Sequence, residues 1–321
     1  MTLHITESEV RQLFTMEMAI DAVESVSRKQ AAGKVIVHPR RRFELPSGGF
    51  FHYMAAMDSE SGYIAMKQYT YVKGTLRFLV PLYEISTGAL LALIEADYMG
   101  QLRTGAASGV ATKYLARQDA KVAAIIGTGG QAKTQLEAVA NVRKLQSARA
   151  YGRDPERRAS FCAEMSGRLG MKVEEANSAA DAVRGVDIVT TATTSGKPVL
   201  SGADLPRGVH INAIGANHAH KRELDDAAIA KADLIFVDSI EQSKHEAGDL
   251  ILPFEKTPEK WAQVHELAQL VAGQVPGRTS EAQTTLFKSN GIAAWDLAAA
   301  AVVYKAARER HFGTDLPFFA S

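Results

Sequence analysis

The sequence predicts a two-domain α/β protein in which a β-rich α+β domain accompanies a Rossmann domain with a doubly wound parallel sheet. Short β-rich runs separated by turns fill residues 35–94. Strands that alternate with helices fill residues 122–240, a pattern typical of a parallel sheet. A glycine-rich turn joins the first of these strands to a helix-forming run. We place the domains at residues 1–118 with 292–321, and at 119–291, because the last predicted helix is long enough to return to the first domain.

The chain begins with a predicted helical region. Apolar residues recur there at helical spacing, and Thr6 followed by Glu9 is a helix start signal. Gly33 is a natural stop. A break near Thr15 or Met16 would divide the region into two helices.

Residues 35–94 then predict an antiparallel sheet. The β-rich runs are VIVHPRRRFEL, GGFFHYMAAM, GYIAMKQYTYV, RFLVPLYEIS and ALLALIEA, and turn signals such as KGT and STG separate them. This sheet carries much of the basic charge of the chain: Arg40, Arg41, Arg42, Lys67, Lys73 and Arg77.

A helix is predicted from Thr104 to Arg117, with Arg103 at its N-terminal end. Its first turn consists almost wholly of small residues, which permit a ligand or a neighbouring backbone to approach closely. A helix N-terminus also favours an anion. The alternative is a tightly packed small-residue helix beside an exposed arginine.

The glycine-rich turn reads Gly127-x-Gly129-x-x-Ala132, which is the form of a dinucleotide-binding fingerprint. Gly127 permits the tight turn, Gly129 lets the backbone approach a pyrophosphate, and Ala132 lets the helix pack against its strand. The alternative is a glycine turn in another kind of α/β protein. The predicted pyrophosphate-binding residues are Gly127, Gly129, Gly130, Gln131 and Ala132.

Further strands are predicted at residues 148–154, 171–176, 186–195, 208–217 and 232–240. Ligands of doubly wound sheets bind at the carboxyl ends of the strands. The candidate cofactor-binding residues at these ends are Arg153, Thr191, Thr193, Gly215 and Asp238. At the end of the second strand, Arg153 suits a ribose 2′-phosphate, which favours NADP, whereas Asp154 keeps NAD open.

Composition excludes several classes of function. The net charge of +1 gives no electrostatic reason to expect a nucleic-acid partner. The single cysteine, Cys162, excludes an intramolecular disulfide and suits a reducing compartment such as the cytoplasm. The first residues lack the features of a secretory signal. The apolar tract at residues 292–307 is interrupted by Asp296 and Lys305, and so predicts a buried or interface helix, not a membrane span. His218 and His220 have no third ligand placed by sequence, and we predict no metal.

Several segments resemble the ornithine cyclodeaminase/mu-crystallin family in their order and spacing, over nearly the whole chain. They are VHPRRR, HYMAAM, AMKQYT, RTGAASG, IIGTGGQA, YGRD, TATTS, INAIGAN with HKREL behind it, VDS and KSNGIAAWDLAAA. The resemblance implies a homodimer built on the β-rich domain, an NAD(P) cofactor, and a small α-imino or α-amino acid substrate.

The resemblance also implies a basic cluster that holds the substrate carboxylate beside the nicotinamide. The matching positions are Arg41, Lys67 and Arg103, and the last two would be the catalytic residues. Arginine suits a carboxylate because its planar fork can bind both oxygens. Strand alternation puts Arg40 and Arg42 on the face opposite Arg41. The other matching positions are Met54 and Asn217 for the substrate, and Thr104 and Gly291 for the cofactor.

One position departs from the family's cyclodeaminases, which carry an acid/base aspartate in a G-x-D-x-x-x-x-x-E-L segment. Counting back from Glu223 places Asn217 there, and an amide cannot exchange a proton at useful pH. We therefore expect an imine reductase or the reverse amino-acid dehydrogenase, acting on a substrate such as iminosuccinate, alanine or pyrroline-2-carboxylate. The alternatives are an ornithine cyclodeaminase and a non-catalytic NADPH-binding protein of the mu-crystallin kind. Spare basic groups are Arg40 or Arg42 and the loop 218–222. One of them serves a second substrate carboxylate, which would favour an imino diacid such as iminosuccinate, or the loop is simply solvated.

Overall fold

The computed structural model describes residues 1–46 and 48–318, and its contacts divide the chain into two units. Unit 1 comprises Met1–Thr104 and Gly291–Ser321, and unit 2 comprises Gly105–Asn290. The predicted first boundary, after residue 118, follows the end of a helix. The structural boundary falls instead inside that helix, α3 (Asp97–Leu115), because its N-terminal part packs with unit 1.

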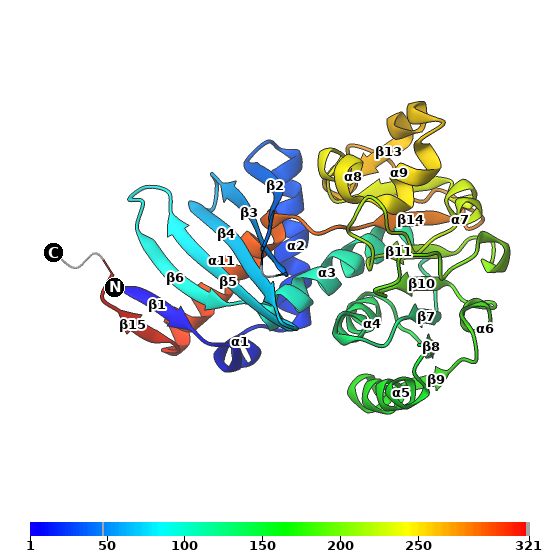
Figure 1. The fold of residues 1–321 in the computed structure, drawn as a ribbon, viewed down its shortest axis with the longest axis horizontal. Helices are drawn as coiled ribbons and strands as arrows, with labels where there is room; N and C mark the ends of the chain where they lie inside the picture. The colour runs from blue at the N-terminus through cyan, green and yellow to red at the C-terminus, as the bar shows by residue number, and fades with distance from the viewer. Residues whose placement is uncertain (47, 319–321) are drawn as a thin grey trace. The chain divides into compact units, whose positions relative to one another are not determined.

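Within the described residues, unit 1 contains a seven-stranded sheet in the order β15-β1-β6-β5-β4-β3-β2 (Figure 1). Its neighbouring strands pair antiparallel, except that β1 and β6 are parallel. The antiparallel sheet predicted for residues 35–94 is thereby confirmed. The strands are β1 (Thr2–Ile5), β2 (Val35–Glu44), β3 (Phe50–Asp58), β4 (Tyr63–Val72), β5 (Thr75–Glu84), β6 (Leu90–Glu95) and β15 (Thr314–Leu316). The sequence does not predict β1 or β15, which are too short to show a period.

Besides the N-terminal part of α3, the described residues of unit 1 form the helices α1 (Glu7–Leu13), α2 (Met16–Ala31) and α11 (Ala293–Arg310). Thr6 and Glu9 form a capping box on α1, and the Thr15 side chain accepts a hydrogen bond from the Met18 N–H at the start of α2. The predicted break near Thr15 is thus confirmed. Helix α11 packs against α2 and against strands β3 and β4, and so covers one face of the sheet.

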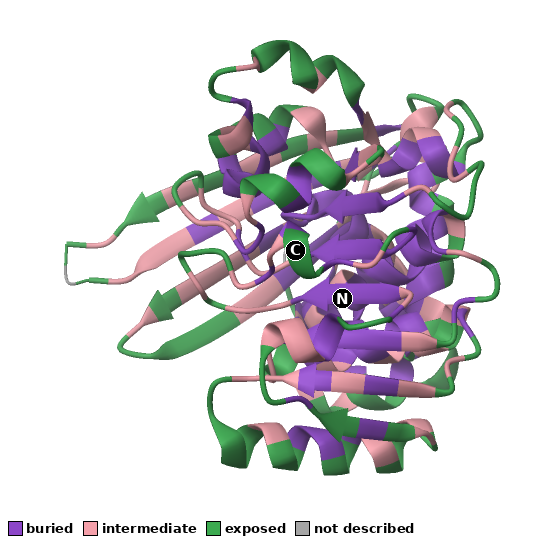
Figure 2. Ribbon diagram, turned by 90° about the vertical axis from the view of Figure 1, so that its right-hand side faces the viewer, coloured by how far each residue is buried: buried purple, intermediate pink, exposed green. Residues whose placement is uncertain are grey.

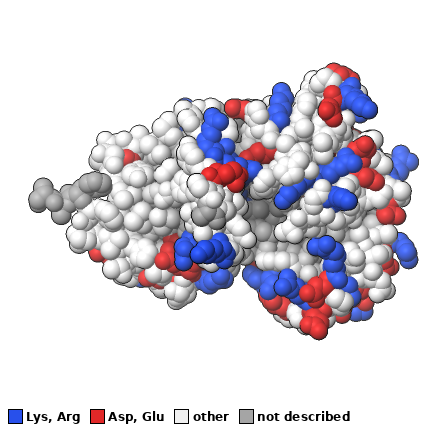
Figure 3. Space-filling model, in the orientation of Figure 1, with Lys and Arg blue, Asp and Glu red and all other residues white. Residues whose placement is uncertain are grey.

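The other face of the sheet carries aromatic side chains and is partly exposed. The ring of Phe43 stacks on those of Phe51 and Tyr53 there, and the rings of Phe51 and Tyr53 are tilted to each other, with all centroids about 6 Å apart. Ile36 and Phe43 are 52% and 58% exposed. In Figure 3, the left-hand part of the molecule shows few charged side chains. Exposed aromatic surface of this kind is typical of a protein–protein interface.

Unit 2 is built on an eight-stranded sheet in the order β13-β12-β14-β11-β10-β7-β8-β9, and every neighbouring pair is parallel. The six adjacent strands that run from β9 across the sheet to β14 have the Rossmann order, so the predicted doubly wound sheet is confirmed. The strands are β7 (Val122–Ile126), β8 (Ser147–Tyr151), β9 (Lys172–Glu175), β10 (Ile188–Thr191), β11 (His210–Ala213), β12 (Leu234–Val237), β13 (Val264–Glu266) and β14 (Thr285–Lys288).

Helices cover both faces of this parallel sheet. Every residue of β10, β11 and β14 is buried, as Figure 2 shows for the centre of the sheet. Along β7, Ala123 and Ile125 pack into one apolar core and Ala124 and Ile126 into another. The helices are α4 (Gly130–Val142), α5 (Pro155–Leu169), α6 (Ala179–Val183), α7 (Asp226–Lys231), α8 (Ile240–Glu246), α9 (Gly248–Phe254) and α10 (Leu267–Val271), with short 3-10 helices at Gly202–Asp204 and Pro258–Gln263.

Helix α3 and strand β14 also differ from the sequence-based expectation. Helix α3 begins at Asp97, not at Thr104, because the Glu7 carboxylate accepts hydrogen bonds from the backbone N–H groups of Asp97 and Tyr98. This cap comes from a residue far away in the chain. Strand β14, for which no strand is predicted, lies in the middle of the parallel sheet. Over the part of the chain that is described, no helix combines the length and apolar character that crossing a bilayer requires.

Candidate active site

A buried charge cluster lies inside unit 1. Lys67 on β4 and Arg103 on α3 are each 4% exposed. The Lys67 Nζ and the Arg103 Nε each donate a hydrogen bond of 3.0 Å to the same oxygen, Oδ1 of Asp296. Asp296 lies in the first turn of α11 and is also buried. Two cations thus share one anion in the protein interior, and the excess positive charge suits a further anion.

The strand register explains why Lys67 points inward. Lys67 pairs with Met54 across β3 and β4, and both side chains lie on the face that α11 covers. The small residue Gly100 on α3 makes room for the ammonium group, since a Cβ there would lie 3.0 Å from the Lys67 Nζ. Lys67 also lies 5.2 Å from the centroid of the Phe78 ring, close enough for a cation–π contact.

Burial is the largest influence on the protonation of Lys67. Together with the neighbouring Arg103 charge it outweighs the opposing effect of Asp296, so the pKa of Lys67 is lowered to about 8. Among the described residues, the Arg103 Nη1 is buried without a hydrogen-bond partner. Buried donors are normally satisfied, and this one is therefore available to a ligand.

A β-bulge decides which arginine joins the cluster. The register of β2 against β3 shifts between His38 and Arg41, so that Pro39 and Arg40 together oppose Met54. Arg41 is exposed and pairs with Tyr53 on the outer face. The Arg40 Nη2 instead donates to the backbone oxygen of Gly291, at 3.3 Å, and approaches the Met54 sulfur. The placement of Arg41 in the cluster is therefore wrong, and Arg40 holds that position.

Two further predicted residues lie beside this cluster in unit 1. Gly291 has a φ of +81°, and a Cβ there would lie 2.7 Å from the Arg103 Nη1, so only glycine fits. The Thr104 hydroxyl donates to the backbone oxygen of Gly100 at 2.7 Å. Because α3 begins at Asp97, Arg103 and Thr104 lie inside the helix, and the idea that an anion meets a helix N-terminus at Arg103 is wrong.

The glycine-rich turn in unit 2 has the geometry that the fingerprint predicts. Gly127 has a φ of +113°, and a Cβ there would lie 2.4 Å from the Ala192 carbonyl oxygen. Gly129 is the N-cap of α4, so no side chain caps the first turn of the helix. A Cβ on Gly129 would meet nothing within 4 Å. Gly130 and Gln131 open the helix, and Ala132 is fully buried against the strand. An uncapped helix N-terminus beside a glycine turn suits a pyrophosphate.

A buried carboxylate joins three of the other predicted residues at the carboxyl ends of β10 and β11. Glu223 accepts hydrogen bonds from the Thr191 hydroxyl at 2.8 Å and from the backbone N–H groups of Thr193 and Gly215 at 2.7 Å. Burial raises the pKa of Glu223, although Lys288 and these donors oppose the shift. Thr191 and Thr193 therefore have a structural role at this edge of the sheet, through their hydrogen bonds to Glu223.

A second layer of buried charge supports the loop that carries Asn217. Asp249 accepts hydrogen bonds from the backbone of Glu223 and Leu224, and it forms an ion pair of 3.1 Å with Lys288. Lys288 also donates to the Ala216 carbonyl oxygen at 2.5 Å. The Oδ1 of Asn217 itself lies 2.9 Å from the Nδ1 of His218.

The remaining predicted residues have separate places in unit 2. Asp238 is buried at the end of β12 and accepts hydrogen bonds from the Ser289 hydroxyl and the Asn290 N–H. At the end of β8, Arg153 is exposed. Asp154 is the N-cap of α5, and its side chain accepts a hydrogen bond from the Arg157 N–H.

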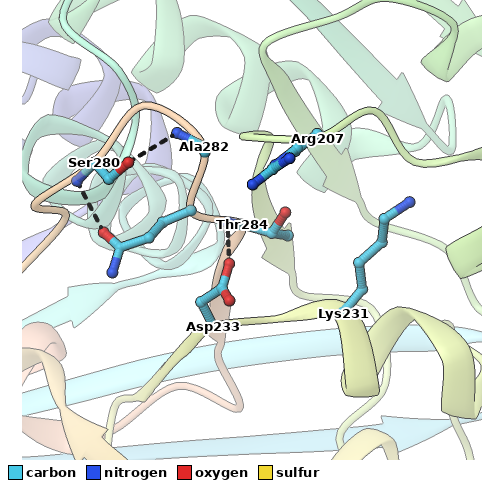
Figure 4. Close-up of a pocket in the computed structure, with 7 residues that line it drawn as sticks. Arg207, Lys231, Asp233, Ser280, Ala282 and Thr284 are labelled. Atoms are coloured by element: carbon cyan, nitrogen blue, oxygen red, sulfur yellow. Dashed lines mark hydrogen bonds between the residues drawn. The ribbon is translucent and has the colours of Figure 1, made fainter.

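A cavity of about 450 Å³ lies at the opposite edge of the parallel sheet (Figure 4). Asp233 and Thr284, which line it, directly precede β12 and β14. The Asp233 carboxylate accepts a hydrogen bond from the Thr284 N–H, and Lys231 donates hydrogen bonds to two backbone oxygens. Asp233 and Lys231 are thus engaged, and the cavity lies at the amino ends of the strands, away from the edge where ligands of such sheets bind.

The sequence does not predict the roles of four charged residues in the unit 1 charge cluster and at the carboxyl ends of the unit 2 strands. They are Arg40 as the inward arginine, Glu223, Lys288 and Asp296. For Asp296 a signal exists, since a charge within the apolar run AAWDLAAAA must find a buried partner or stay exposed. Glu223 and Lys288 lie in the segments HKREL and KSNGIAAWDLAAA of the family resemblance, but their roles cannot be predicted because their partners are distant in sequence.

The sequence model of the ornithine cyclodeaminase/mu-crystallin family matches residues 2–311. A Delta(1)-pyrroline-2-carboxylate reductase of Bacillus cereus is 39% identical over 247 residues, which are 77% of this chain and 76% of that protein. Alanine dehydrogenase of Archaeoglobus fulgidus is 35% identical over 330 residues, covering 99% of each chain.

Solved structures are similar over almost the whole chain. Delta(1)-pyrroline-2-carboxylate reductase of Thermococcus litoralis, in complex with NADH and L-proline, has a TM-score of 0.94 at 37% identity and covers 98% of this chain and 100% of its own. An archaeal alanine dehydrogenase dimer with bound NAD has a TM-score of 0.93 at 36% identity, with 99% of each chain covered. The iminosuccinate reductase of Paracoccus denitrificans, in complex with NAD+, has a TM-score of 0.92 at 29% identity, with 98% of each covered.

Proposed function

Because the chain belongs to the ornithine cyclodeaminase/mu-crystallin family, we propose that its site reduces a small α-imino acid to an L-amino acid, or runs the reverse oxidation. The protein is an NAD(P)-dependent oxidoreductase that acts on imine or amine groups. The observation that carries the proposal is the buried cluster in which Lys67 and Arg103 share the single carboxylate of Asp296. The net positive charge and the unpartnered Arg103 Nη1 call for an anionic substrate group such as a carboxylate.

The chain contributes mainly positioning and electrostatics. The bound nicotinamide supplies or accepts the hydride. Arg103 holds the substrate carboxylate, Lys67 holds the same carboxylate or orients the imine nitrogen, and Arg40 adds a third positive charge from β2. Gly127 to Ala132 hold the pyrophosphate at the N-terminus of α4. A protonated imine carries its own positive charge and needs little further acid catalysis, so an amide at Asn217 suffices.

Asn217 also distinguishes this reaction from cyclodeamination. The cyclisation of ornithine requires ammonia to leave and a proton to be managed at the amine, which an amide cannot do. A non-catalytic role in NADPH binding is disfavoured by the buried cations, because burying them is costly unless an acidic ligand uses them.

For the cofactor, Arg153 favours the phosphorylated dinucleotide. Its guanidinium is exposed at the end of β8, where the ribose 2′ position of a Rossmann cofactor lies. Asp154, which would otherwise bind a 2′-hydroxyl, is engaged as the N-cap of α5. The similar solved structures contain NAD or NADH, so kinetics with both cofactors decide the preference.

For the assembly, we infer a homodimer formed through the exposed face of the unit 1 sheet. The aromatic residues Phe43, Phe51 and Tyr53 lie on that face, and large exposed apolar surface favours association. One similar solved structure is an alanine dehydrogenase dimer.

The test is a substrate screen with the purified full-length protein. Candidate substrates are pyrroline-2-carboxylate, pyruvate with ammonia, and oxaloacetate with ammonia, each with NADH and with NADPH. Oxidation of the cofactor that depends on one of these substrates is expected. Formation of proline and ammonia from ornithine at a comparable rate would instead establish a cyclodeaminase.

The site assignment is tested with Lys67→Met and Arg103→Leu. Each substitution removes one of the two buried cations that would bind the substrate carboxylate, so kcat/KM should fall by about a hundredfold or more. The exposed Lys121 and Arg207 provide the matched controls Lys121→Met and Arg207→Leu, which should keep wild-type rates. Unchanged rates in both site variants would show that the reaction occurs elsewhere.

A further inference from the structure

We propose that Asp296 is a positioning residue of the imine-reducing site: its carboxylate fixes Lys67 and Arg103 in the arrangement that receives the substrate carboxylate. This inference rests on the proposed function, and it gives a specific role to a residue that does not itself need to contact the substrate.

The geometry supports a positioning role. One oxygen of Asp296 accepts from the Lys67 Nζ and from the Arg103 Nε, at 3.0 Å in each case. The arginine is held through Nε, so its Nη1 is left for another ligand. The three residues come from β4, α3 and α11, so this oxygen joins three separate elements of unit 1.

The surroundings of Asp296 hold its carboxylate in place. Its neighbours in sequence, Trp295 and Leu297, are each 1% exposed, so little water can reach the Asp296 carboxylate to form hydrogen bonds with it. It lies in the first turn of α11, where the helix dipole stabilises an anion. Within the described part of the chain, its other oxygen, Oδ2, is buried without a hydrogen-bond partner. A carboxylate in this setting depends on its two cations, and they depend on it.

The arrangement also controls the charge of Lys67. The groups that face it are Arg40 from β2, Arg103 from α3 and Asp296 from α11, together with the rings of Phe78 and Tyr69. His52 on β3 is hydrogen-bonded to Tyr69. Burial and the two arginines lower the pKa of Lys67, and Asp296 alone opposes them. Without this anion, Lys67 loses its proton at a lower pH.

The first experiment compares Asp296→Asn with the wild-type protein. The expected result is a KM for the imino acid that rises by at least about tenfold, with a smaller change in kcat. A tenfold rise in KM corresponds to the loss of one modest binding interaction with the substrate. The alkaline limb of the kcat/KM profile should move to lower pH. The variant Glu309→Gln, at an exposed position of the same helix, should leave both unchanged. A wild-type KM and pH profile in Asp296→Asn would overturn the inference.

The second variant, Asp296→Glu, keeps the charge but moves the oxygens by one methylene. The alkaline limb should stay near its wild-type position while KM rises. If Asp296→Asn does not fold, this variant decides alone: a wild-type KM in Asp296→Glu overturns the positioning role.

A third measurement separates this inference from the proposed function. The Lys67 side chain is titrated by NMR of 13C-labelled lysine without substrate, and its Cε signal is identified by its absence in Lys67→Met. A lower midpoint in Asp296→Asn supports the coupling even if no imino acid is reduced, and an unchanged midpoint contradicts it. Failure of the wild-type protein to reduce any imino acid contradicts only the proposed reaction.

Discussion

At the scale of single residues, Arg40 and Arg41 are neighbours in sequence but belong to opposite faces of the sheet. Arg40 reaches the backbone of Gly291, whereas Arg41 lies on the outer face with Tyr53. Two arginines that are adjacent in the sequence therefore have different surroundings. Only the inward residue can add charge to the cluster around Lys67.

This difference leads to a paired prediction. In Arg40→Met, KM for the imino acid should rise by about tenfold or more, because a charge near the substrate carboxylate is lost. In Arg41→Met, steady-state kinetics should stay within about twofold of wild type, since surface changes are usually small. The reverse order of effects would return Arg41 to the site.

The pKa of Lys67 gives a prediction for pH dependence. Because burial lowers this pKa to about 8, the ammonium charge is present below that pH and is lost as the pH rises through it. Binding of a carboxylate should therefore weaken above about pH 8. Inhibition by pyrrole-2-carboxylate, whose ring nitrogen does not titrate in this range, measures the effect directly. In Lys67→Arg the alkaline loss should disappear, because arginine stays charged; a limb that persists there belongs to another group.

The sequence identifies Lys67 and Arg103 through the family resemblance, but it cannot place Arg40. Strand alternation continued from the inward Val35 and Val37 would turn Arg41 inward. The bulge at Pro39 inserts one residue and reverses the alternation beyond it. Asp296 is a charge in an apolar helix and lies in a segment of the family resemblance, but its role cannot be predicted because its partners lie 229 and 193 positions away.

At the scale of elements, the turn between β7 and α4 contains two glycines with different requirements. Gly127 needs its positive φ and has no room for a Cβ beside Ala192. Gly129 has a φ of −86° and open space around its Cβ position. The fold alone therefore demands glycine only at Gly127.

We predict that the two positions respond differently to alanine. Gly127→Ala should lower the melting temperature by several degrees, because strain at such a φ costs about 1–3 kcal/mol. Gly129→Ala should melt like the wild type but bind the dinucleotide about tenfold or more weakly, since the pyrophosphate needs close backbone approach. Thermal unfolding and titration of NADH fluorescence measure the two effects. Wild-type affinity in Gly129→Ala would place the pyrophosphate elsewhere.

Local signals predict elements well where the partner is close in sequence. The capping box at Thr6 and the glycine turn at Gly127 are both of this kind. The start of α3 escapes prediction because its cap, Glu7, is some ninety residues earlier. Strand β14 escapes because four buried residues show no period that separates them from a helix.

At the scale of the whole molecule, the exposed aromatic face of unit 1 predicts the assembly. Phe43→Glu should convert a dimer into a monomer, because a charge placed in an apolar interface is costly to bury. Leu252→Glu, at another exposed apolar residue, is the matched control and should leave the dimer intact. Sedimentation velocity distinguishes the two. A dimeric Phe43→Glu protein would locate the interface on a different surface.

The order of the sequence also affects how this molecule is made. During translation, Lys67 leaves the ribosome 229 residues before Asp296, the anion that balances it. All of unit 2 emerges in between. Until the final part of the chain is synthesised, the nascent β-sheet lacks helix α11. The Lys67 ammonium group then also lacks its counter-ion. Unit 2 is complete before α11 is synthesised and can thus fold first, and a chain that lacks α11 would have no assembled cluster around Lys67.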